Sequence, residues 1–267
     1  MKIATWNING IKARINVLLQ WLEQAQPDVA CLQEIKSLDE AFPANVLEDA
    51  GYNVETHGQK GFNGVALLSK FPLEDIRRGL PGDDEDTQAR YIEALIMAPG
   101  TPYRVASLYL PNGNPVHTEK FTYKLAWMKR LEAHAAQLLE AEERVVLAGD
   151  YNVIPEPYDC HSPEAWVNDA LFQPESRQSF RKLKNLGFTE ALRACDPNDG
   201  VYTFWDYQAG AWQKNNGIRI DHMLLSPQAA DRLMHVSVDK HTRGWEKPSD
   251  HVPVCVNFTP ESDLRRS

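Results

Sequence analysis

Polar residues that can bind a metal ion or a phosphate lie beside apolar, strand-like segments at many points along the chain. They are carboxylates, amides, one tyrosine and one histidine: Asn7, Glu34, Tyr109, Asp150, Asn152, Asp221, Asp250 and His251. Asn7 follows the apolar run KIATW, for example, and Glu34 follows VACLQ. If these segments are strands of shared sheets, their ends can converge in one crevice. The pattern therefore predicts a composite polar site.

Four of these residues are carboxylates, and their charge restricts the chemistry. Carboxylates brought together repel one another, and their pKa values rise unless a cation balances them. A hard divalent ion does so through oxygen ligands, and Mg²⁺ characteristically takes one or two carboxylates, several waters and phosphate oxygens of a substrate. Cysteine and paired histidines are missing from the set, which argues against zinc. We expect Mg²⁺, with Mn²⁺ as a substitute.

Each of these motifs taken singly has an ordinary structural explanation. The segment GDYN can be a polar turn after a buried strand, and SDH can be a turn or cap before the next strand. His251 can be a core histidine with its hydrogen bonds satisfied, and Tyr109 a buried tyrosine at a strand end. The ordered series over nearly the whole chain favours a shared function, because turn chemistry alone does not predict it.

Short strands and amphipathic helices are the elements that must position these residues. Helices are expected where apolar residues recur every three or four positions, at Ile15 to Gln24, Glu119 to Glu140 and Gln178 to Leu186. Strands are expected at Lys2 to Trp6, Val29 to Leu32, Gly64 to Leu68, Ile92 to Met97, Arg104 to Leu110, Val145 to Ala148, Ile220 to Leu225, Val236 to Val238 and Val252 to Phe258. This mixture predicts an α/β fold of stacked layers.

Length and composition are those of an ordinary globular protein. The 267 residues exceed the usual ~100 to 200 of one domain, but not by enough to require two. No linker, low-complexity segment or repeat divides them, so we expect one domain over residues 1–260 and a polar tail over 261–267. The stretches Gly79 to Thr87 and Pro155 to Pro174 lack periodicity, which is typical of surface loops that carry substrate contacts.

Charge and cysteine usage limit the partners and the compartment. The chain has 37 acidic and 28 basic residues and a formal charge of −9, so a polyanionic substrate must be held by local basic groups or a metal. The four cysteines are far apart, without a CxxC pair, and indicate reduced thiols. No stretch reaches the ~18 apolar residues of a membrane span. We expect a cytoplasmic protein.

A family resemblance rests on motifs spread from Met1 to about Phe258. They are WNINGIKAR, PDVACLQEIK, GYNVETHGQKGFNGVALLSK, RRGLPGDDEDTQAR, YLPNG, LAGDYNV, GFTEALR, YTFWDY, NNGIRIDH and EKPSDHVPV. With them the chain resembles the exonuclease III family of AP endonucleases, in the endonuclease/exonuclease/phosphatase superfamily. The resemblance implies a four-layer α/β sandwich, with two mixed sheets packed face to face and helices outside. It also implies a Mg²⁺-dependent phosphodiesterase that cleaves DNA 5′ to abasic sites, with 3′ to 5′ exonuclease and 3′-phosphatase or phosphodiesterase activity in base-excision repair.

The resemblance and the chemistry together suggest a role for each site residue. Glu34 is the candidate for direct metal coordination, with Asn7 and Asp250 as direct or water-mediated partners. Asp150 is expected to orient and deprotonate the attacking water, with Asn152 and Asn7 holding the water or a phosphate oxygen in line. The family pattern assigns Asp221 as the carboxylate partner of His251, and a charged His251 would stabilise the transition state. Tyr109 can donate its hydroxyl to the phosphate or the leaving group.

Substrate contacts are also implied by the resemblance. Phe204, Ile218 and Ile220 would line a small apolar pocket for a flipped-out sugar without its base, although some relatives carry tryptophan at the position of Ile218. Trp212 could wedge into the duplex or simply anchor its loop. Backbone contacts are expected from Lys60, Arg90, Asn112, Lys120, Lys124, Arg177 and Lys214, of which Arg90 and Asn112 lie inside matched motifs. Double-stranded DNA with abasic sites or blocked 3′ ends is the expected partner, bound by a monomer that is associated with the nucleoid when bound to DNA.

Two other hypotheses remain open from the sequence. One is another hydrolase of the superfamily, such as a DNase I-like nuclease or a phosphoinositide phosphatase, but those relatives usually have histidine at the position of Tyr109. The other is a catalytically silent DNA-binding or partner-binding module, which the complete set of site residues disfavours. The balance of endonuclease and exonuclease activity and the number of metal ions are not determined by the sequence.

Overall fold

The computed structural model describes residues 1–100 and 102–260, so the predicted tail over 261–267 lies outside the described residues. Within them, two six-stranded sheets pack face to face. The first sheet has the order β11 (Leu233–Val238), β12 (Val254–Phe258), β1 (Lys2–Asn7), β2 (Val29–Gln33), β4 (Val65–Ser69) and β3 (Asn53–His57). The second has the order β5 (Leu73–Arg78), β6 (Tyr91–Ile96), β7 (Tyr103–Tyr109), β8 (Arg144–Asp150), β10 (Asp221–Leu225) and β9 (Thr189–Glu190).

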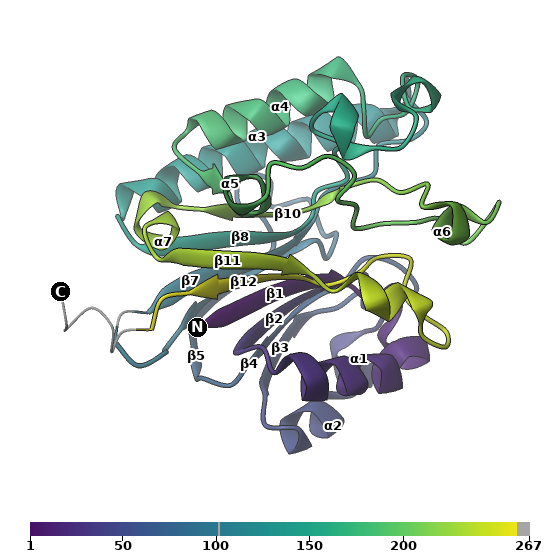
Figure 1. Cartoon of the computed structure of the whole chain (residues 1–267). Helices are drawn as coiled ribbons and strands as arrows, with labels where there is room; N and C mark the ends of the chain where they lie inside the picture. Colours follow the sequence, from purple (N-terminus) through teal and green to yellow (C-terminus); the bar gives the residue numbers. More distant parts are fainter. Residues whose placement is uncertain (101, 261–267) are drawn as a thin grey trace.

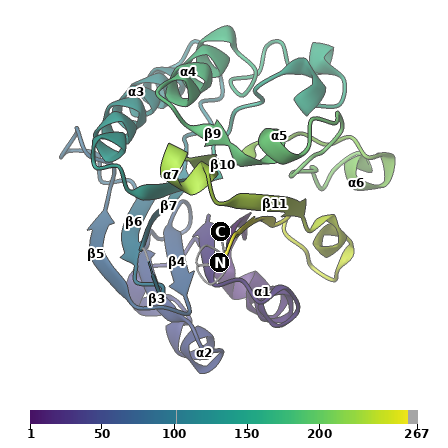
Figure 2. The ribbon, with the colours of Figure 1, turned by 60° about the vertical axis from the view of Figure 1, so that its left-hand side comes forward.

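Helices cover the outer face of each sheet, as Figures 1 and 2 show. The first sheet is covered by α1 (Ile11–Ala25) and α2 (Ala44–Asp49), and the second by α3 (Glu119–Glu140) and α4 (Pro174–Asn185). The shorter helices are α5 (Ala191–Cys195), α6 (Ala211–Lys214) and α7 (Pro227–Ala230). The predicted four-layer α/β sandwich is confirmed.

The burial of β1 and β2 on both faces explains why their sequences are almost continuously apolar. Ile3 and Cys31 face the second sheet, whereas Ala4, Ala30 and Leu32 on the opposite face pack in the cluster beneath α1. Strands covered on both faces read as apolar runs rather than as alternating patterns. The same core fixes the register of the strands, because a slip of one residue would exchange the two faces.

Three strands were not predicted: β3, β5 and β9. The strands β3 and β5 are edge strands whose residues are mostly half-buried or exposed, and their sequences NVETH and LEDIRR lack an apolar run. Polar edge strands are common because they discourage pairing with other chains. The strand β9 has only two residues. All nine predicted strand segments are strands in the structure, and all three predicted helices are helices.

Each sheet includes a parallel pair of strands, β1 with β2 and β7 with β8. The carboxyl ends of parallel neighbours lie at the same edge of a sheet. Asn7 ends β1 and Glu34 follows β2, while Tyr109 and Asp150 end β7 and β8. The fold therefore brings four of the predicted residues to one end of the sandwich.

Candidate functional site

The strand register of the second sheet aligns three site residues side by side. Asp150 pairs with Tyr109 on the parallel strand β7 and with Asp221 on the antiparallel strand β10. Gly149, directly before Asp150, allows this close pairing, since a Cβ there would lie 1.9 Å from the backbone oxygen of Leu108. Backbone pairing thus sets the spacing of this row of side chains, which are the hydroxyl group of Tyr109 and the carboxylates of Asp150 and Asp221.

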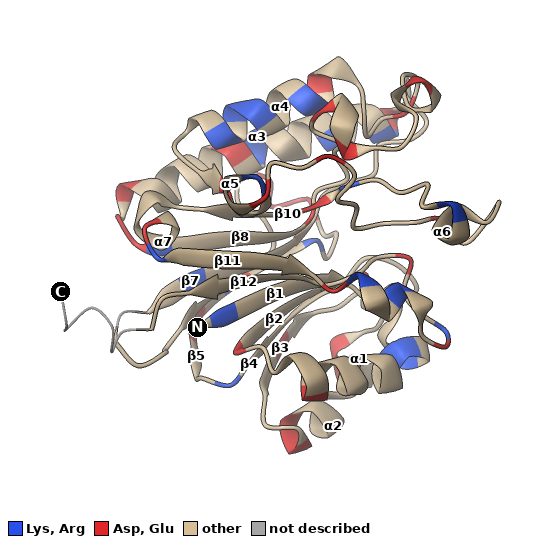
Figure 3. Ribbon diagram, in the orientation of Figure 1, with Lys and Arg blue, Asp and Glu red and all other residues tan. Residues whose placement is uncertain are grey.

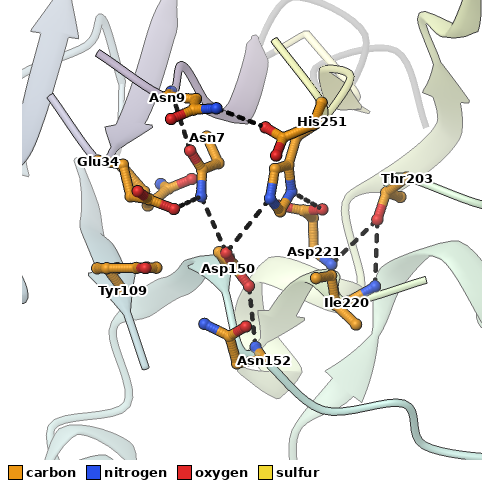
Figure 4. Close-up of polar contacts among 12 residues, drawn as sticks. Asn7, Asn9, Glu34, Tyr109, Asp150, Asn152, Thr203, Ile220, Asp221 and His251 are labelled. Atoms are coloured by element: carbon orange, nitrogen blue, oxygen red, sulfur yellow. Dashed lines mark hydrogen bonds and ion pairs between the residues drawn. The ribbon is translucent and has the colours of Figure 1, made fainter. Parts of the chain in front are cut away.

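Residues from both sheets meet at this row, as Figure 4 shows. The amide nitrogen Nδ2 of Asn7 donates to Glu34 Oε1 at 2.9 Å and to Asp150 Oδ2 at 3.0 Å. Ligand atoms of Glu34, Asp150 and His251 all lie within 4.8 Å of one another. One amide from the first sheet therefore bridges two carboxylates, one beside each sheet.

His251 lies between two carboxylates. Its Nδ1 is 2.8 Å from Asp221 Oδ2, and its Nε2 is 3.7 Å from Asp150 Oδ2. Burial alone would lower the pKa of His251, but the charges of Asp221 and Asp150 outweigh it and raise the pKa to about 10. An imidazolium has no free lone pair for a metal. His251 thus supplies a positive charge next to the carboxylates rather than a metal ligand.

Asp150 is also buried, but burial changes its pKa in the opposite direction. Burial raises the pKa of its carboxyl group to about 7, with the charge of His251 opposing and that of Asp221 adding to the rise. The backbone N–H of Asn152 donates to Asp150 Oδ1 at 2.9 Å. A carboxyl group with a pKa near neutrality can exchange a proton at the pH of the cell.

Glu34 is held as a carboxylate at the open side of the site, where its side chain is 19% exposed. Burial would raise its pKa, but the hydrogen bond from Asn7 and the charge of Lys36, whose Nζ is 3.0 Å from Oε2, lower it. The backbone of Glu34 is left-handed, with a φ of 48°. Such conformations in residues other than glycine concentrate at functional sites.

Asn152 is fixed on three sides. Its N–H bonds Asp150, its Nδ2 donates to the backbone oxygen of Leu110 at 2.8 Å, and its Oδ1 accepts from Asn112 Nδ2 at 3.4 Å. Its φ is 46°, a left-handed value that asparagine tolerates better than most residues. The loop between β7 and α3 (residues 110–118, the Asn112 loop) and the segment after β8 (residues 151–156, the Asn152 turn) are thus joined by a side-chain hydrogen bond.

Tyr109 and Arg90 form a pair beside the carboxylates. The guanidinium of Arg90 lies 5.0 Å from the centre of the Tyr109 ring, and its Nη1 donates to the backbone oxygen of Tyr109 at 3.3 Å. Burial, together with the charges of Glu34 and Asp150, raises the pKa of Tyr109 well above its usual value. Tyr109 therefore keeps its proton and can act as a hydrogen-bond donor.

Asp250 stands slightly apart from the three clustered groups. Its Oδ1 accepts from Asn9 Nδ2 at 3.1 Å and lies 3.4 Å from Ser249 Oγ, while Asn9 Oδ1 accepts from Lys36 at 2.6 Å. Asp250 is absent from the group whose ligand atoms lie within 4.8 Å. It reaches the cluster through Asn9, whose N–H also donates to Asn7 Oδ1.

The three residues of the predicted apolar pocket lie together. Phe204 pairs with Ile218 and with His251 through isolated β-bridges, and its ring centre is 4.9 Å from that of His251. Ile218 and Ile220 are each only 2% exposed, inside a cluster that also contains Ile154. Phe204 is partly exposed, unlike the two isoleucines.

The residues predicted to contact DNA differ in how exposed their side chains are. Lys60, Asn112, Lys120 and Lys214 are exposed, and Arg177 is half-buried and donates to the backbone oxygen of Pro155 and to Glu156. Trp212 is half-buried in α6 with its ring 5.0 Å from that of Trp205, so it does anchor its loop. The prediction of a DNA backbone contact is wrong for Lys124, whose side chain is fully buried.

Several supporting residues escaped the sequence analysis. Asn9 and Lys36 join Asp250 to Glu34, and Thr203 Oγ1 accepts from the backbone N–H groups of Ile220 and Asp221. Asn9 and Lys36 do lie inside the matched motifs WNINGIKAR and PDVACLQEIK, which was the available signal. Thr203 lies inside the matched motif YTFWDY, but its role depends on contacts with Ile220 and Asp221, 17 and 18 residues further along the chain.

The donor set fits a hard divalent cation. The ligand atoms available beside Asn7 are carboxylate oxygens of Glu34 and Asp150, and burial leaves their negative charge poorly solvated. Oxygen donors suit Mg²⁺, Mn²⁺ or Ca²⁺ rather than zinc.

In the part of the chain that the structure describes, none of the helices has the length and apolar character of a membrane span.

Known proteins match this chain over almost its full length. Exodeoxyribonuclease III of Haemophilus influenzae is 36% identical over 266 residues, covering 97% of this chain and 100% of that protein. The structure of an AP endonuclease from Archaeoglobus fulgidus is 37% identical, with a TM-score of 0.91 and coverage of 97% and 99%. The structure of the 3′ phosphatase NExo from Neisseria, bound to a product DNA hairpin, is 36% identical, with a TM-score of 0.92 and coverage of 97% and 100%.

These relatives indicate a phosphodiester hydrolase of the exodeoxyribonuclease III and AP endonuclease type. The family model described as "Endonuclease/Exonuclease/phosphatase family" matches residues 4–251, a range that contains every residue of the site. The chain therefore belongs to the endonuclease/exonuclease/phosphatase family.

Proposed function

We propose that the chain is a Mg²⁺-dependent DNA-repair nuclease of the cytoplasm that cleaves the phosphodiester backbone 5′ to abasic sites and removes blocking groups from 3′ ends. The cluster of Glu34, Asp150 and His251 carries this proposal, because it joins carboxylates for a cation, a base near neutral pKa and a fixed positive charge. The names of the relatives support DNA as the substrate, including the one bound to a DNA hairpin.

Glu34 is the proposed direct ligand of the cation, with Asn7 and Asp250 as direct or water-mediated partners. When bound, a divalent cation would neutralise phosphate charge and stabilise the negative charge on the leaving 3′ oxygen. Asn7 holds the Glu34 and Asp150 carboxylates at a fixed separation. The hydrogen bond from Asn7 and the charge of Lys36 lower the pKa of Glu34 and so favour the carboxylate form that can coordinate.

Asp150 is the proposed general base. It would accept a proton from a water whose oxygen attacks phosphorus in line with the 3′ oxygen that leaves. Asn152, held by Leu110 and Asn112, would orient that water or a phosphate oxygen. His251, kept protonated by Asp221, would donate to a phosphate oxygen, and Tyr109 would donate to the phosphate or the leaving group.

The substrate contacts are proposed from their position around this centre. Phe204 would contact the sugar of an abasic nucleotide, with Ile218 and Ile220 as the floor beneath it. Arg90, Asn112 and Lys120 would hold backbone phosphates, and such contacts carry little sequence preference. Trp212 lies on α6, a short helix that also carries Lys214 and projects from the body of the molecule (Figure 3). Trp212 would contact the duplex next to the lesion.

Three labelled substrates test this function side by side in millimolar Mg²⁺: a duplex with one abasic site, the same duplex intact, and an inositol phosphate. The expected result is one cut 5′ to the abasic site that leaves a 3′ hydroxyl and disappears with EDTA. An abasic duplex left uncut would refute the proposal. Faster hydrolysis of intact DNA or of the inositol phosphate would assign the chain to another activity of the family.

A further inference from the structure

Lys124 is a fully buried lysine in the second turn of α3, directly beneath the site. Its Nζ donates to the backbone oxygen of Asn112 at 3.1 Å and to that of Asn152 at 2.5 Å. These two acceptors belong to the Asn112 loop and the Asn152 turn, which also meet through their side-chain amides. One ammonium group therefore joins the backbones of both segments.

Burying a lysine carries a cost that ordinary packing does not require. Burial lowers the pKa of Lys124 to about 7, with the charges of Asp150 and Asp169 opposing the change. A charge away from water is tolerated only when hydrogen bonds and opposite charge compensate it. An apolar residue would fill the same space in α3 beside Trp127 and Met128 without this penalty.

The local packing is shaped around this side chain. A Cβ at Gly113 would lie 2.5 Å from Cδ of Lys124, and the φ of Gly113 is 87°. Glycine is the residue that adopts this backbone without strain and lets the loop close over the lysine stem. Asn152, on the other side, holds a left-handed backbone whose carbonyl points at Nζ.

We propose that Lys124 is a positioning residue that ties the Asn112 loop to the Asn152 turn and so holds the Asn152 amide in place for hydrolysis. This inference rests on the proposed function, because Asn152 matters only if Asp150 activates water. Lys124 touches neither substrate nor cation. Its effect should therefore appear through Asn152 and be absent when Asn152 is truncated.

A double-mutant cycle on the abasic duplex tests this role. Lys124→Met should lower kcat ~100-fold, as small misplacements of reacting groups do, with KM changed less than about threefold. In the Asn152→Ala background, Lys124→Met should cost less than about threefold more, because its effect passes through Asn152. Lys124→Arg, which keeps the charge and the donors, should recover part of kcat. Lys129→Met, on an exposed lysine of the same helix, is the matched control and should leave kcat and KM unchanged.

The outcomes separate the inference from the proposed function. An inactive wild-type protein would refute the function. An active wild-type protein with near-normal kcat in Lys124→Met, or with additive losses in the double variant, would overturn the role of Lys124. If Lys124→Met does not fold, Lys124→Gln and Lys124→Arg replace it in the cycle. If none of the three folds while Lys129→Met does, Lys124 is a stability residue and the inference is wrong.

Discussion

At the scale of single residues, the surroundings of His251 give its two neighbouring carboxylates different roles. His251 lies between Asp221 and Asp150, so a proton on the ring is stabilised from both sides. Burial raises the pKa of Asp150 to about 7, and its carboxylate is 3.7 Å from the ring, against 2.8 Å for that of Asp221. Two acidic groups near one ring thus receive different tasks from their surroundings: Asp221 holds the charge of the ring, and Asp150 exchanges a proton.

The pKa of Asp150 predicts the acidic limb of the rate profile. Asp150 must be deprotonated to accept a proton, so kcat/KM should fall as pH drops through about 7. A cation favours the deprotonated carboxylate, so more Mg²⁺ should move this limb to lower pH. Cleavage rates measured from about pH 5 to about pH 9 at two Mg²⁺ concentrations check both statements. A limb that stays at the same pH in both series would contradict the coupling of Asp150 to the cation.

Much of this residue set could be predicted from the sequence, because strand ends are visible there. Asn7, Glu34, Tyr109 and Asp150 all close apolar runs, and the structure brings them together. Lys124 could not be predicted, since a lysine on a helix is usually solvated and nothing local marks it as buried. Its burial depends on two loops that come from distant parts of the chain.

At the scale of elements, the segment that carries Ile218 and Ile220 is held by an ion network on its other side. Arg219 lies between them in the sequence. Its side chain is buried, with Nε 2.8 Å from Asp159 Oδ1 and Nη1 3.0 Å from Glu190 Oε1. Asp159 also pairs with Arg193, from α5. The network connects the loop after β8, the strand β9 and the proposed pocket.

Removing Arg219 should therefore destabilise the molecule. Arg219→Met leaves Glu190 without this partner in a buried position, and breaking a buried pair typically costs ~3 to 5 kcal/mol. Urea unfolding of Arg219→Met against wild type measures this change in the free energy of unfolding. Arg181→Met is the control, because its ion pair with Glu156 is exposed and should be worth less than about 1 kcal/mol. Equal effects of the two substitutions would show that the network does not hold this element.

The elements that bury an apolar face were predictable and the exposed edge strands were not, for one physical reason. Strands such as β8 and helices such as α3 bury continuous or periodic apolar faces that the sequence displays. The edge strands β3 and β5 expose much of their surface, and the position of Arg219 is set by partners far away in the chain. Non-local pairing of this kind leaves no local pattern to detect.

At the scale of the whole molecule, a net charge of −9 must be reconciled with a polyanionic substrate. Basic residues recur along α4 and one lies on α6, as the colouring of the ribbon in Figure 3 shows, whereas the carboxylates Glu34, Asp150 and Asp221 meet at the site. Affinity for DNA should therefore depend on local contacts that release counterions, and fall with added salt.

Salt titration of DNA binding tests this distribution of charge. The association constant for an abasic duplex should fall linearly on logarithmic axes, and Lys120→Ala should reduce the slope by about 1, the value of one phosphate contact. Lys129→Ala removes an exposed lysine of the same helix at a distance from the site and should leave the slope unchanged. Equal slopes for Lys120→Ala and wild type would show that Lys120 makes no contact with a DNA phosphate.

The most direct measurement of the central claim compares Glu34→Gln with Asp150→Asn on an abasic duplex over a Mg²⁺ titration. Glu34→Gln should need ~10-fold or more Mg²⁺ and recover part of its turnover at saturation, because it weakens a cation ligand. Asp150→Asn should remain ~10³-fold or more below wild type at every Mg²⁺ concentration, because it lacks the base. Near-normal turnover of either folded variant would contradict the account.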